Sequence, residues 1–580
     1  MRMFWNEGTA GIHHRPAKDC KCGRRSRSPL LWEWKQVRLI MSKFIGDSRK
    51  KRLNSVSETA LNRPPAFKEG ETRPSAAYAI FACMAALYLL PFMRVLLPWT
   101  NEGTLASGAV RIVHGQVFAR DFFEVMGPGT FYLLAGFFKV LGVSFIALRA
   151  DLFVTSLGTA LLVYFLSRRV CSEYRTLPCL VLAGTYYGLQ WPGISHHVDS
   201  NFFSLLAVAT VVLWQQKRWA SLLISAGVLA GLTVCFHQTK GLALFLSILL
   251  WLRVRHREEF AALSSRFVLG FAGVGAPVLV WFWSQSALGS LFYANLVWPF
   301  RHYEAVNVIP YGLGIFSQYW HQWVHGDGRM NWSVWMGAIL IVPFLFIAAL
   351  PLIVTVLGVR YRGKTAPPEV LLYAICGSAL WTSEMHRKDI YHLVFGAPLL
   401  LILCVHFLLQ SRKRIADYAL QILAITSGCL MVFNLLLVST AHAIPTRVGS
   451  VAMYEDSPVV AFLDAHTVSG EETFVYPYCP IYYFLTATMN PTRFITLTYN
   501  YNTAEEFQDT IRILDEHKVR YVVWDSNFLT RTASRVFSNA ARTPAEGFVM
   551  EKYLEAHYAT VLDDHGLRVL ERNPEHAAGK

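Results

Sequence analysis

Long apolar runs separated by short polar loops dominate the chain between residues 76 and 440. A helix that crosses a bilayer needs about 20 largely apolar residues. We predict a membrane-spanning helix for each of eleven segments: 76–98, 149–167, 177–194, 201–216, 219–236, 241–254, 267–286, 333–357, 368–383, 391–411 and 417–440. This pattern is typical of a polytopic α-helical membrane protein.

The loop that follows the first apolar segment contains two further stretches with a regular pattern. Residues 104–117 are mildly amphipathic, and residues 131–143 are apolar but too short to cross a bilayer comfortably. Helices of this kind lie in the plane of the membrane interface. We therefore predict two interfacial helices in the first outer loop.

The pattern changes near residue 446, where shorter strand-like and helix-like stretches begin to alternate. Glu472–Tyr478 and Val519–Asp525 have the apolar character of buried strands, and Ala504–Lys518 has helical periodicity. Thr560–Leu570 contains Asp-Asp-His-Gly at its centre, which predicts a hairpin. The sequence therefore predicts a small C-terminal α/β domain.

Composition supports a membrane protein and excludes several other classes. Of 580 residues, 53% are hydrophobic and only 16% are charged, whereas soluble domains have roughly 25% charged residues. Ten cysteines are too sparse for a disulfide-stapled secreted domain. The net charge of +15 is not gathered on one folded soluble region, so we expect no nucleic-acid partner.

The distribution of charge predicts three regions. Residues 1–75 contain 17 Lys and Arg against 7 acidic residues and form a basic, disordered cytoplasmic N-terminus. Residues 76–445 form the transmembrane domain. Residues 446–580 contain 12 Lys and Arg against 18 acidic residues and form the α/β domain. Met41 is an alternative start, which would leave 1–40 outside the natural protein.

Basic residues in alternate loops predict the orientation. One set of short loops carries most of them, and cytoplasmic loops are the ones enriched in Lys and Arg. These are Arg168, Arg169, Arg175, Lys217, Arg218, Arg253, Arg255, Arg257, Arg266, Arg360, Arg362, Lys364, Arg412, Lys413 and Arg414. The N-terminus is then cytoplasmic and the C-terminal domain periplasmic, in a bacterial cytoplasmic (inner) membrane.

The opposite face gathers chemically active side chains at the ends of the predicted spans. Charge near a membrane is costly and needs a reason. Carboxylates can act as general bases, and cations suit a phosphate group that emerges from the bilayer. The residues are Glu102, Asp121, Asp199, His196, His197, His237, His392, Lys240, Arg387 and Lys388. Ordinary solvated loop acids, interfacial histidines and a snorkelling lysine are the alternatives.

The first outer loop, NEGTLASGAVRIVHGQVFARDFFEVMGPGTFYLLAGFFKVLGVS, resembles that of the GT-C superfamily of integral-membrane glycosyltransferases. It looks most like the bacterial branch similar to dolichyl-phosphate-mannose mannosyltransferases and related to aminoarabinose transferases. HQTKG at 237–241 and HRKDIYH at 386–392 resemble outer-loop motifs of the same branch. The resemblance extends over residues 76–400, and more weakly to the C-terminal α/β domain.

The resemblance implies transfer of a sugar from a polyprenyl-phosphate donor to a lipid, glycan or protein acceptor. The transfer would be an inverting single displacement, and no nucleotide would be needed. The family places an acidic pair after the first span, matched here by Asn101-Glu102, and a later acid at the outer end of another span, matched by Asp199. Asp121 lies in the RDF…GPG part of the loop.

Asn101 departs from the family pattern, because the pair usually begins with Asp and asparagine cannot act as a base. Three interpretations follow. Glu102 or Asp121 is the base, Asp199 is the base, or the site is weak or lost. Asn101, His196, His197, His237, Lys240, Arg387, Lys388 and His392 are the predicted substrate-binding residues.

Two other functions stay open at this point. A transporter or flippase for a lipid-linked sugar would place charges at the bilayer midplane and show repeats, which we do not find. A catalytically inactive membrane scaffold is the other. No cofactor is required by the sequence, although some superfamily members use a divalent metal.

Overall fold

The structure is a computed structural model of the chain. It describes residues 74–97, 101–186, 193–303, 311, 332–361, 366–411, 414–499, 501–528 and 548–574. The predicted N-terminal region, except for its last two residues, lies outside the described residues. So do Met41 and four of the basic loop residues, Arg362, Lys364, Arg412 and Lys413.

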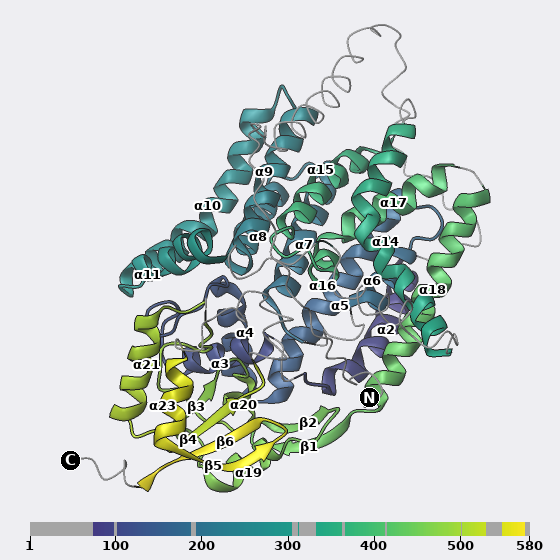
Figure 1. Cartoon of the computed structure of the whole chain (residues 1–580). Coiled ribbons are helices and arrows are strands. Elements are labelled where there is room, and N and C mark those ends of the chain that lie inside the picture. The colour runs from purple at the N-terminus through teal and green to yellow at the C-terminus, as the bar shows by residue number, and fades with distance from the viewer. Residues whose placement is uncertain are drawn as a thin grey trace, which may run out of the picture. The chain divides into compact units, whose positions relative to one another are not determined.

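A helix lies at each of the eleven predicted segments (Figure 1). The first and tenth segments are each interrupted, at η4(Leu90–Arg94) and between α16(Ile390–Gly396) and α17(Pro398–Ser411). The other helices are α2(Pro74–Leu89), α5(Phe145–Val170), α6(Leu177–Tyr186), α7(His196–Lys217), α8(Ala220–Phe236), α9(Gln238–Arg255), α10(Phe260–Ser284), α14(Trp332–Arg360), α15(Pro368–Ser383) and α18(Arg414–Ser439).

Fewer than eleven of these helices meet the length and composition expected of a membrane span. Within the described residues, six helices are long and apolar enough to cross a membrane. The bent pair α16 and α17, which meet at 74°, would make a seventh. Helix α6 is described for 10 residues, or about 15 Å, which is half the thickness of a hydrocarbon core. The count of eleven spans therefore stays a prediction.

Several of the helices present large apolar side chains outward. Exposed examples are Ile80, Met84 and Leu87 on α2, Leu269, Val280 and Trp283 on α10, and Ile422, Ile425 and Val432 on α18. Such a surface is unfavourable in water, but lipid tails are as apolar as leucine. The chain is therefore a multi-pass membrane protein.

Two helices occupy the loop after the first apolar segment, where the sequence predicts two helices. They are α3(Glu102–Val113) and α4(Pro128–Leu141). Helix α3 is buried over most of its length because the C-terminal part of the chain packs against it. A Cβ atom at Gly103 would overlap the backbone of Ile481, so glycine allows this close approach. In the described residues up to 303, three short helical segments follow α10: α11(Leu288–Phe292), η5(Tyr293–Val297) and η6(Pro299–Tyr303).

The described part of the C-terminal region, 442–499, 501–528 and 548–574, forms two sheets and four helices. A hairpin of β1(His442–Thr446) and β2(Gly449–Met453) precedes a four-stranded sheet with the order β3-β4-β6-β5. Strands β3(Thr473–Tyr476) and β4(Tyr521–Asp525) are parallel, whereas β5(Tyr558–Asp564) and β6(Leu567–Arg572) form an antiparallel hairpin. The helices are α19(Pro458–His466), α20(Ile481–Leu485), α21(Ala504–Glu516) and α23(Val549–His557). These elements match the predicted strands, helix and hairpin.

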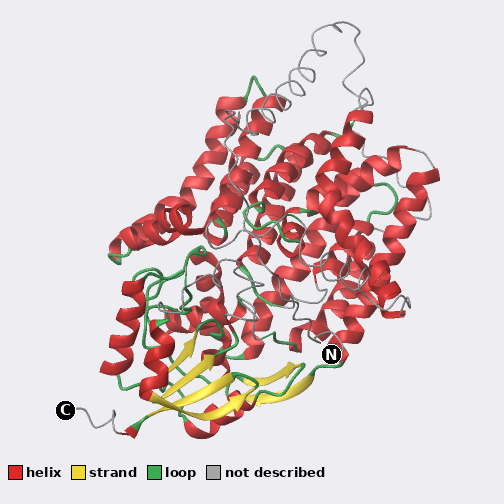
Figure 2. Cartoon of the chain, viewed as in Figure 1, coloured by secondary structure: helices red, strands yellow, loops and turns green. Residues whose placement is uncertain are grey.

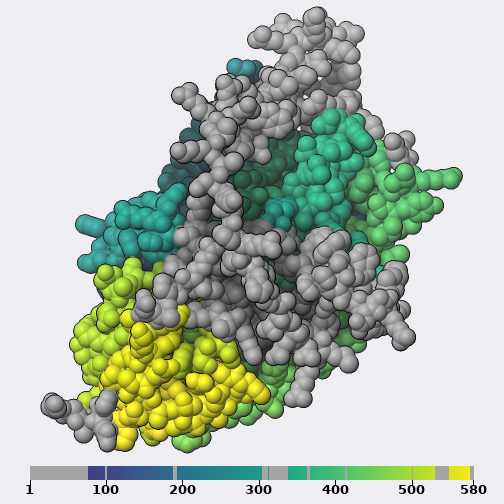
Figure 3. Space-filling model, viewed as in Figure 1, coloured from purple at the N-terminus to yellow at the C-terminus, as the bar shows by residue number. Residues whose placement is uncertain are grey.

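Backbone hydrogen bonds join these elements to the first outer loop. Leu96 N–H donates to Ala452 O at 2.9 Å, and Phe123 N–H donates to Arg493 O at 2.8 Å. Figure 2 shows the strands gathered beside α3 and α4, and Figure 3 shows the continuous surface formed by the C-terminal elements. The C-terminal elements therefore help to hold the outer loop in place. The domain boundary at residue 446 stays a prediction.

Candidate functional site

The first turn of α7 is the centre of the candidate site. Ser195 begins the helix by accepting a hydrogen bond from His197 N–H at 3.3 Å. His197 and Asp199 follow within the same turn, and both side chains are buried. Helices α7, α8, α9 and α15 pack in succession, so the start of α7 meets the junctions between the other helices (Figure 1).

Glu102 is held in a buried ion pair with Arg149. The Arg149 guanidinium contacts both carboxylate oxygens, and Nη2 lies 3.0 Å from Oε2. Arg149 also donates to Val95 O at 2.7 Å, while Ile194 N–H donates to Glu102 Oε1 at 3.1 Å. Glu102 therefore links α3, α5 and the segment before α7. To act as a base it would have to leave its guanidinium partner.

Asp121 lies in the turn between α3 and α4. Arg120 binds both of its carboxylate oxygens, at 2.8 and 2.9 Å, and Val117 N–H donates to it at 2.6 Å. The hydrogen bonds from Arg120 lower the pKa of Asp121 although burial opposes this. The pair is partly exposed.

Asp199 has no basic partner among its hydrogen bonds in the described residues. Its Oδ2 accepts a hydrogen bond from Thr130 Oγ1 at 2.6 Å. Asp151 on α5 is close enough for the two carboxylates to repel each other electrostatically. Asp151 is fully buried, and neither of its oxygens has a hydrogen-bond partner in the described part of the chain.

The Gly-Pro-Gly turn before α4 sets the position of Thr130. A Cβ atom at Gly127 would overlap the carbonyl oxygen of Cys235, and one at Gly129 would lie 2.9 Å from the same atom. The glycines therefore let α4 begin directly against the end of α8. This brings Thr130 to Asp199.

A buried polar cluster begins at His196 and His197, in the same turn of α7 as Asp199, and also contains Lys240, Glu384, His237, His386 and His392. Lys240 Nζ lies 2.5 Å from Glu384 Oε1, and His197 Nδ1 lies 3.1 Å from Glu384 Oε2. The ring centre of His197 is within 6.0 Å of the rings of the other four histidines. Burial raises the pKa of Glu384, but Lys240 and His237 outweigh it and hold the pKa below its ordinary value.

Asp389 organises the edge of this cluster. It begins α16 by accepting from His392 N–H at 3.0 Å, and it also contacts His392 Nδ1 at 2.7 Å and Arg387 Nε at 2.9 Å. Burial would raise the pKa of Asp389, but His392 and Arg387 together lower it. Lys388 is exposed next to this pair.

The structure thus brings together six of the eleven predicted site residues, His196, His197, His237, Lys240, Arg387 and His392. Asp199 lies in the same turn of α7 as His196 and His197. Lys388 lies at the edge. Glu102 is joined to the start of α7 through Ile194, and Asn101 accepts a hydrogen bond from Tyr478 O–H at 2.7 Å. Asp121 lies in a separate turn.

Sequence reasoning did not select Glu384, His386, Asp389 or Asp151. One signal for Glu384 was available. A lysine at the end of an apolar segment is rarely buried unless it is paired. Glu384 is a carboxylate at the end of another predicted span on the same face. Asp151 gave a similar signal, as an acid inside the predicted span 149–167.

Four residues of the cluster have the donor atoms of a metal site. His197, His237, Glu384 and His386 each offer one ligand atom, and these atoms all lie within 4.8 Å of one another. His237 Nε2 is buried and has no hydrogen-bond partner in the described part of the chain.

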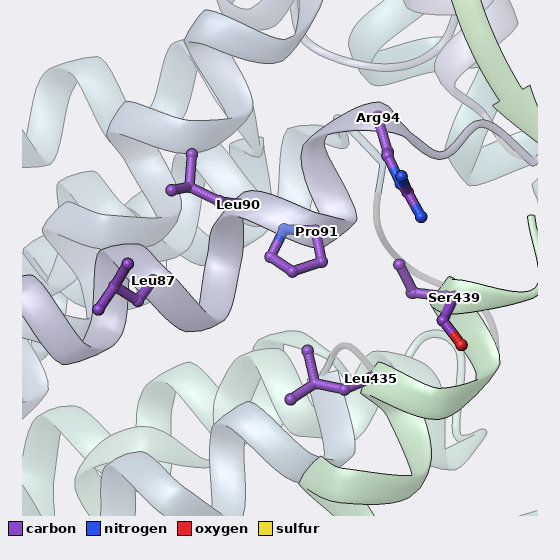
Figure 4. Close-up of a pocket in the computed structure, with 7 residues that line it drawn as sticks. Leu87, Leu90, Pro91, Arg94, Leu435 and Ser439 are labelled. Atoms are coloured by element: carbon purple, nitrogen blue, oxygen red, sulfur yellow. The ribbon is translucent and has the colours of Figure 1, made fainter. Parts of the chain in front are cut away.

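A separate groove of about 530 Å³ lies between α2, η4 and α18 (Figure 4). Its lining is mainly apolar, with Leu87, Leu90, Pro91, Leu435 and Val438, and has Arg94 and Ser439 at one end. Arg94 directly precedes Val95, whose carbonyl oxygen binds Arg149. The polar end of the groove therefore lies close in sequence to the Glu102 ion pair.

No family model and no curated protein matches the chain. Solved structures that resemble it include ArnT from Cupriavidus metallidurans in the apo state. That comparison has a TM-score of 0.53 and 10% identity, covering 88% of this chain and 100% of that one. The Archaeoglobus fulgidus oligosaccharyltransferase tethered with an acceptor peptide has a TM-score of 0.43 and 14% identity, covering 87% and 74%. The chain therefore shares the fold of ArnT, in line with the fold that the resemblance of its loop after the first apolar segment predicts.

Proposed function

We propose that this chain is an integral-membrane glycosyltransferase of the bacterial inner membrane. It transfers a sugar from a polyprenyl-phosphate donor to a lipid, glycan or protein acceptor on the outer face. The observation that carries the proposal is the first turn of α7. There Asp199, a carboxylate without a basic partner among its hydrogen bonds in the described residues, lies in the same turn as His197, which belongs to the buried cluster of Lys240, Glu384 and histidines. The shared fold with ArnT supports the same reading.

Asp199 is the base that we propose. Glu102 and Asp121 each hold an arginine on both oxygens, which stabilises their ionised forms and blocks their lone pairs. In the reaction Asp199 takes the proton of an acceptor hydroxyl. The hydroxyl oxygen then attacks the anomeric carbon, and the bond from that carbon to the lipid phosphate breaks.

The leaving phosphate needs cationic partners. Lys240 is bound to Glu384, and Arg387 is bound to Asp389 but keeps 19% of its side chain exposed. Exposed Lys388 and the open side of Arg387 are therefore the first contacts that we propose for the phosphate. Lys240 and His392, which are buried, would then stabilise the negative charge of the phosphate from the interior side of the site.

The groove between α2 and α18 is proposed to hold the lipid chain of one substrate. Its apolar lining suits a hydrocarbon chain, and Arg94 at one end suits an anionic head group.

The test is donor consumption by the purified chain in detergent. Radiolabelled polyprenyl-phosphate sugars would be incubated with it and a membrane lipid extract. We expect consumption by the wild type, and a loss of 10² to 10⁴-fold in Asp199→Asn, the size of a general-base contribution. Asp121→Asn is the matched control and should keep most of the activity. Full activity in Asp199→Asn would refute the base assignment.

A wild type that consumes no donor would contradict the proposed activity of this sequence. Activity that appears only in Asn101→Asp would then identify Asn101 as the reason. Asp at this position can still accept the hydrogen bond from Tyr478.

A further inference from the structure

The buried cluster of Lys240, Glu384 and histidines contains a set of donors from three separate parts of the fold. His197 comes from the first turn of α7, His237 from the junction of α8 and α9, and Glu384 and His386 from the segment between α15 and α16. Only tertiary packing unites them. Their four ligand atoms lie within 4.8 Å of one another, and His386 alone among the four is partly exposed.

The spacing of the donors is close to that of a tetrahedral zinc site. Zinc binds histidine nitrogen at roughly 2.0–2.1 Å, which separates tetrahedral ligand atoms by about 3.4 Å. The four ligand atoms would therefore move together by about 1 Å or less. Side-chain rotations can supply a movement of this size without a change in the helices.

The surroundings of the donors also fit a metal. Ligating histidines usually hold their second ring nitrogen on an oxygen, and ligating carboxylates are themselves hydrogen-bonded. His386 Nδ1 lies 2.9 Å from Ser383 O. His237 Nδ1 lies 3.1 Å from Thr239 Oγ1 and also accepts a hydrogen bond from Lys240 N–H at 3.4 Å, which fixes the orientation of its ring. These contacts leave His237 Nε2 pointing into buried space without a partner in the described residues.

Lys240 does not prevent Glu384 from binding a metal, because it contacts only one of the two carboxylate oxygens. Its Nζ lies on Oε1, whereas Oε2 faces His197. A metal can take Oε2 while Lys240 keeps Oε1, so that Lys240 becomes the outer partner that orients the carboxylate. A donor set rich in imidazole, with one carboxylate, favours zinc over magnesium or calcium.

We propose that His197, His237, His386 and Glu384 bind one zinc ion. Four protein ligands fill a tetrahedral shell, which is the arrangement of a structural site. The ion would join α7, α9 and the segment before α16, and so fix the turn that carries Asp199. The site needs neither donor nor acceptor, and metal content can be measured whether or not the chain transfers sugar.

The experiment is metal analysis of the full chain in detergent. The protein would be stripped with a chelator, reloaded with zinc sulfate and freed of excess metal. We expect about one zinc per chain in the wild type, and a decrease of roughly tenfold or more in His237→Gln and Glu384→Gln. Reloading with Co²⁺ alone should give the intense visible absorption of tetrahedral cobalt.

His196→Gln is the matched control. The His196 ring lies 4.1 Å from that of His197 but is outside the donor set, so this variant should keep its zinc. Equal loss of zinc in His196→Gln and His237→Gln would overturn the assignment, as would a wild type that retains no zinc. If the His237 and Glu384 variants do not fold, the visible spectrum of the Co²⁺-loaded wild type tests the site instead. Intense tetrahedral absorption would support four protein ligands, and a weak octahedral spectrum would contradict them.

Discussion

Lys240 and Glu384 form an ion pair that is completely buried, with Nζ 2.5 Å from Oε1 and no exposed surface on either side chain. Removal of one partner leaves a buried charge without compensation, which typically costs about 3–5 kcal/mol. We expect metal-free Lys240→Met to unfold at a clearly lower temperature in detergent. The double variant Lys240→Met with Glu384→Gln should recover much of the loss. A single variant as stable as the wild type would show that the pair is not formed.

The guanidinium of Arg149 binds Glu102 and Val95 at once, a geometry that lysine cannot reproduce. We expect Arg149→Lys to lose about 1–3 kcal/mol of stability. Transfer activity should fall as well, because Glu102 anchors Ile194 just before α7. Arg512→Lys is the control, since its ion pair is 57% exposed on the arginine side and should matter little. Unfolding in detergent and donor consumption measure the two effects.

Glu124 gives the protein a pH-dependent stability. Burial raises its pKa from 4.5 to about 7, although Val125 N–H donates to its carboxylate. Between these values the folded chain holds a proton that the unfolded chain has released, so stability falls as pH rises. The full effect is roughly 3 kcal/mol.

Glu124→Gln cannot ionise, and its thermal stability should therefore change less between about pH 4.5 and pH 7. It should be more stable than the wild type above pH 7. Exposed Glu555→Gln is the control and should follow the wild type. Parallel curves for the wild type and Glu124→Gln would contradict the shift.

Gly127 has no room for a side chain against Cys235. Gly127→Ala should cost about 1–3 kcal/mol, the usual range for overpacking, and should reduce activity by displacing Thr130 from Asp199. Gly136→Ala is the matched comparison on the same helix. Nothing lies within 4 Å of its added Cβ, and helix propensity favours alanine by up to about 1 kcal/mol. Similar losses in both variants would refute the packing argument.

The groove can be tested with neighbouring residues of α18. Leu435 lines the groove, whereas Leu436 is 62% exposed and does not. Leu435→Trp should fill part of the groove and raise the KM for a lipid-linked substrate several-fold, with little change in kcat. Leu436→Trp should leave both values close to those of the wild type. An unchanged KM in Leu435→Trp would show that the lipid chain binds elsewhere.

Much of the architecture followed from local pattern. Apolar runs of sufficient length form helices wherever they lie in the chain, because a helix satisfies its own backbone hydrogen bonds. The strand and helix patterns after residue 446 also correspond to strands and helices in the structure. Thr503 and Glu506, for example, form the capping box that begins α21. Loop motifs also located most of the polar residues that the structure gathers.

What only the tertiary structure decided is the electrostatic state of each polar residue. Glu102 and Arg149 are 47 residues apart in the sequence, and they meet only because α4 packs against both α3 and α5. Lys240 is neutralised by Glu384 because α9 packs against α15. A sequence shows that a carboxylate is present. Whether it is ion-paired or available to accept a proton depends on which charge lies within a few ångströms of it in the buried interior, and that is a property of the packed helices.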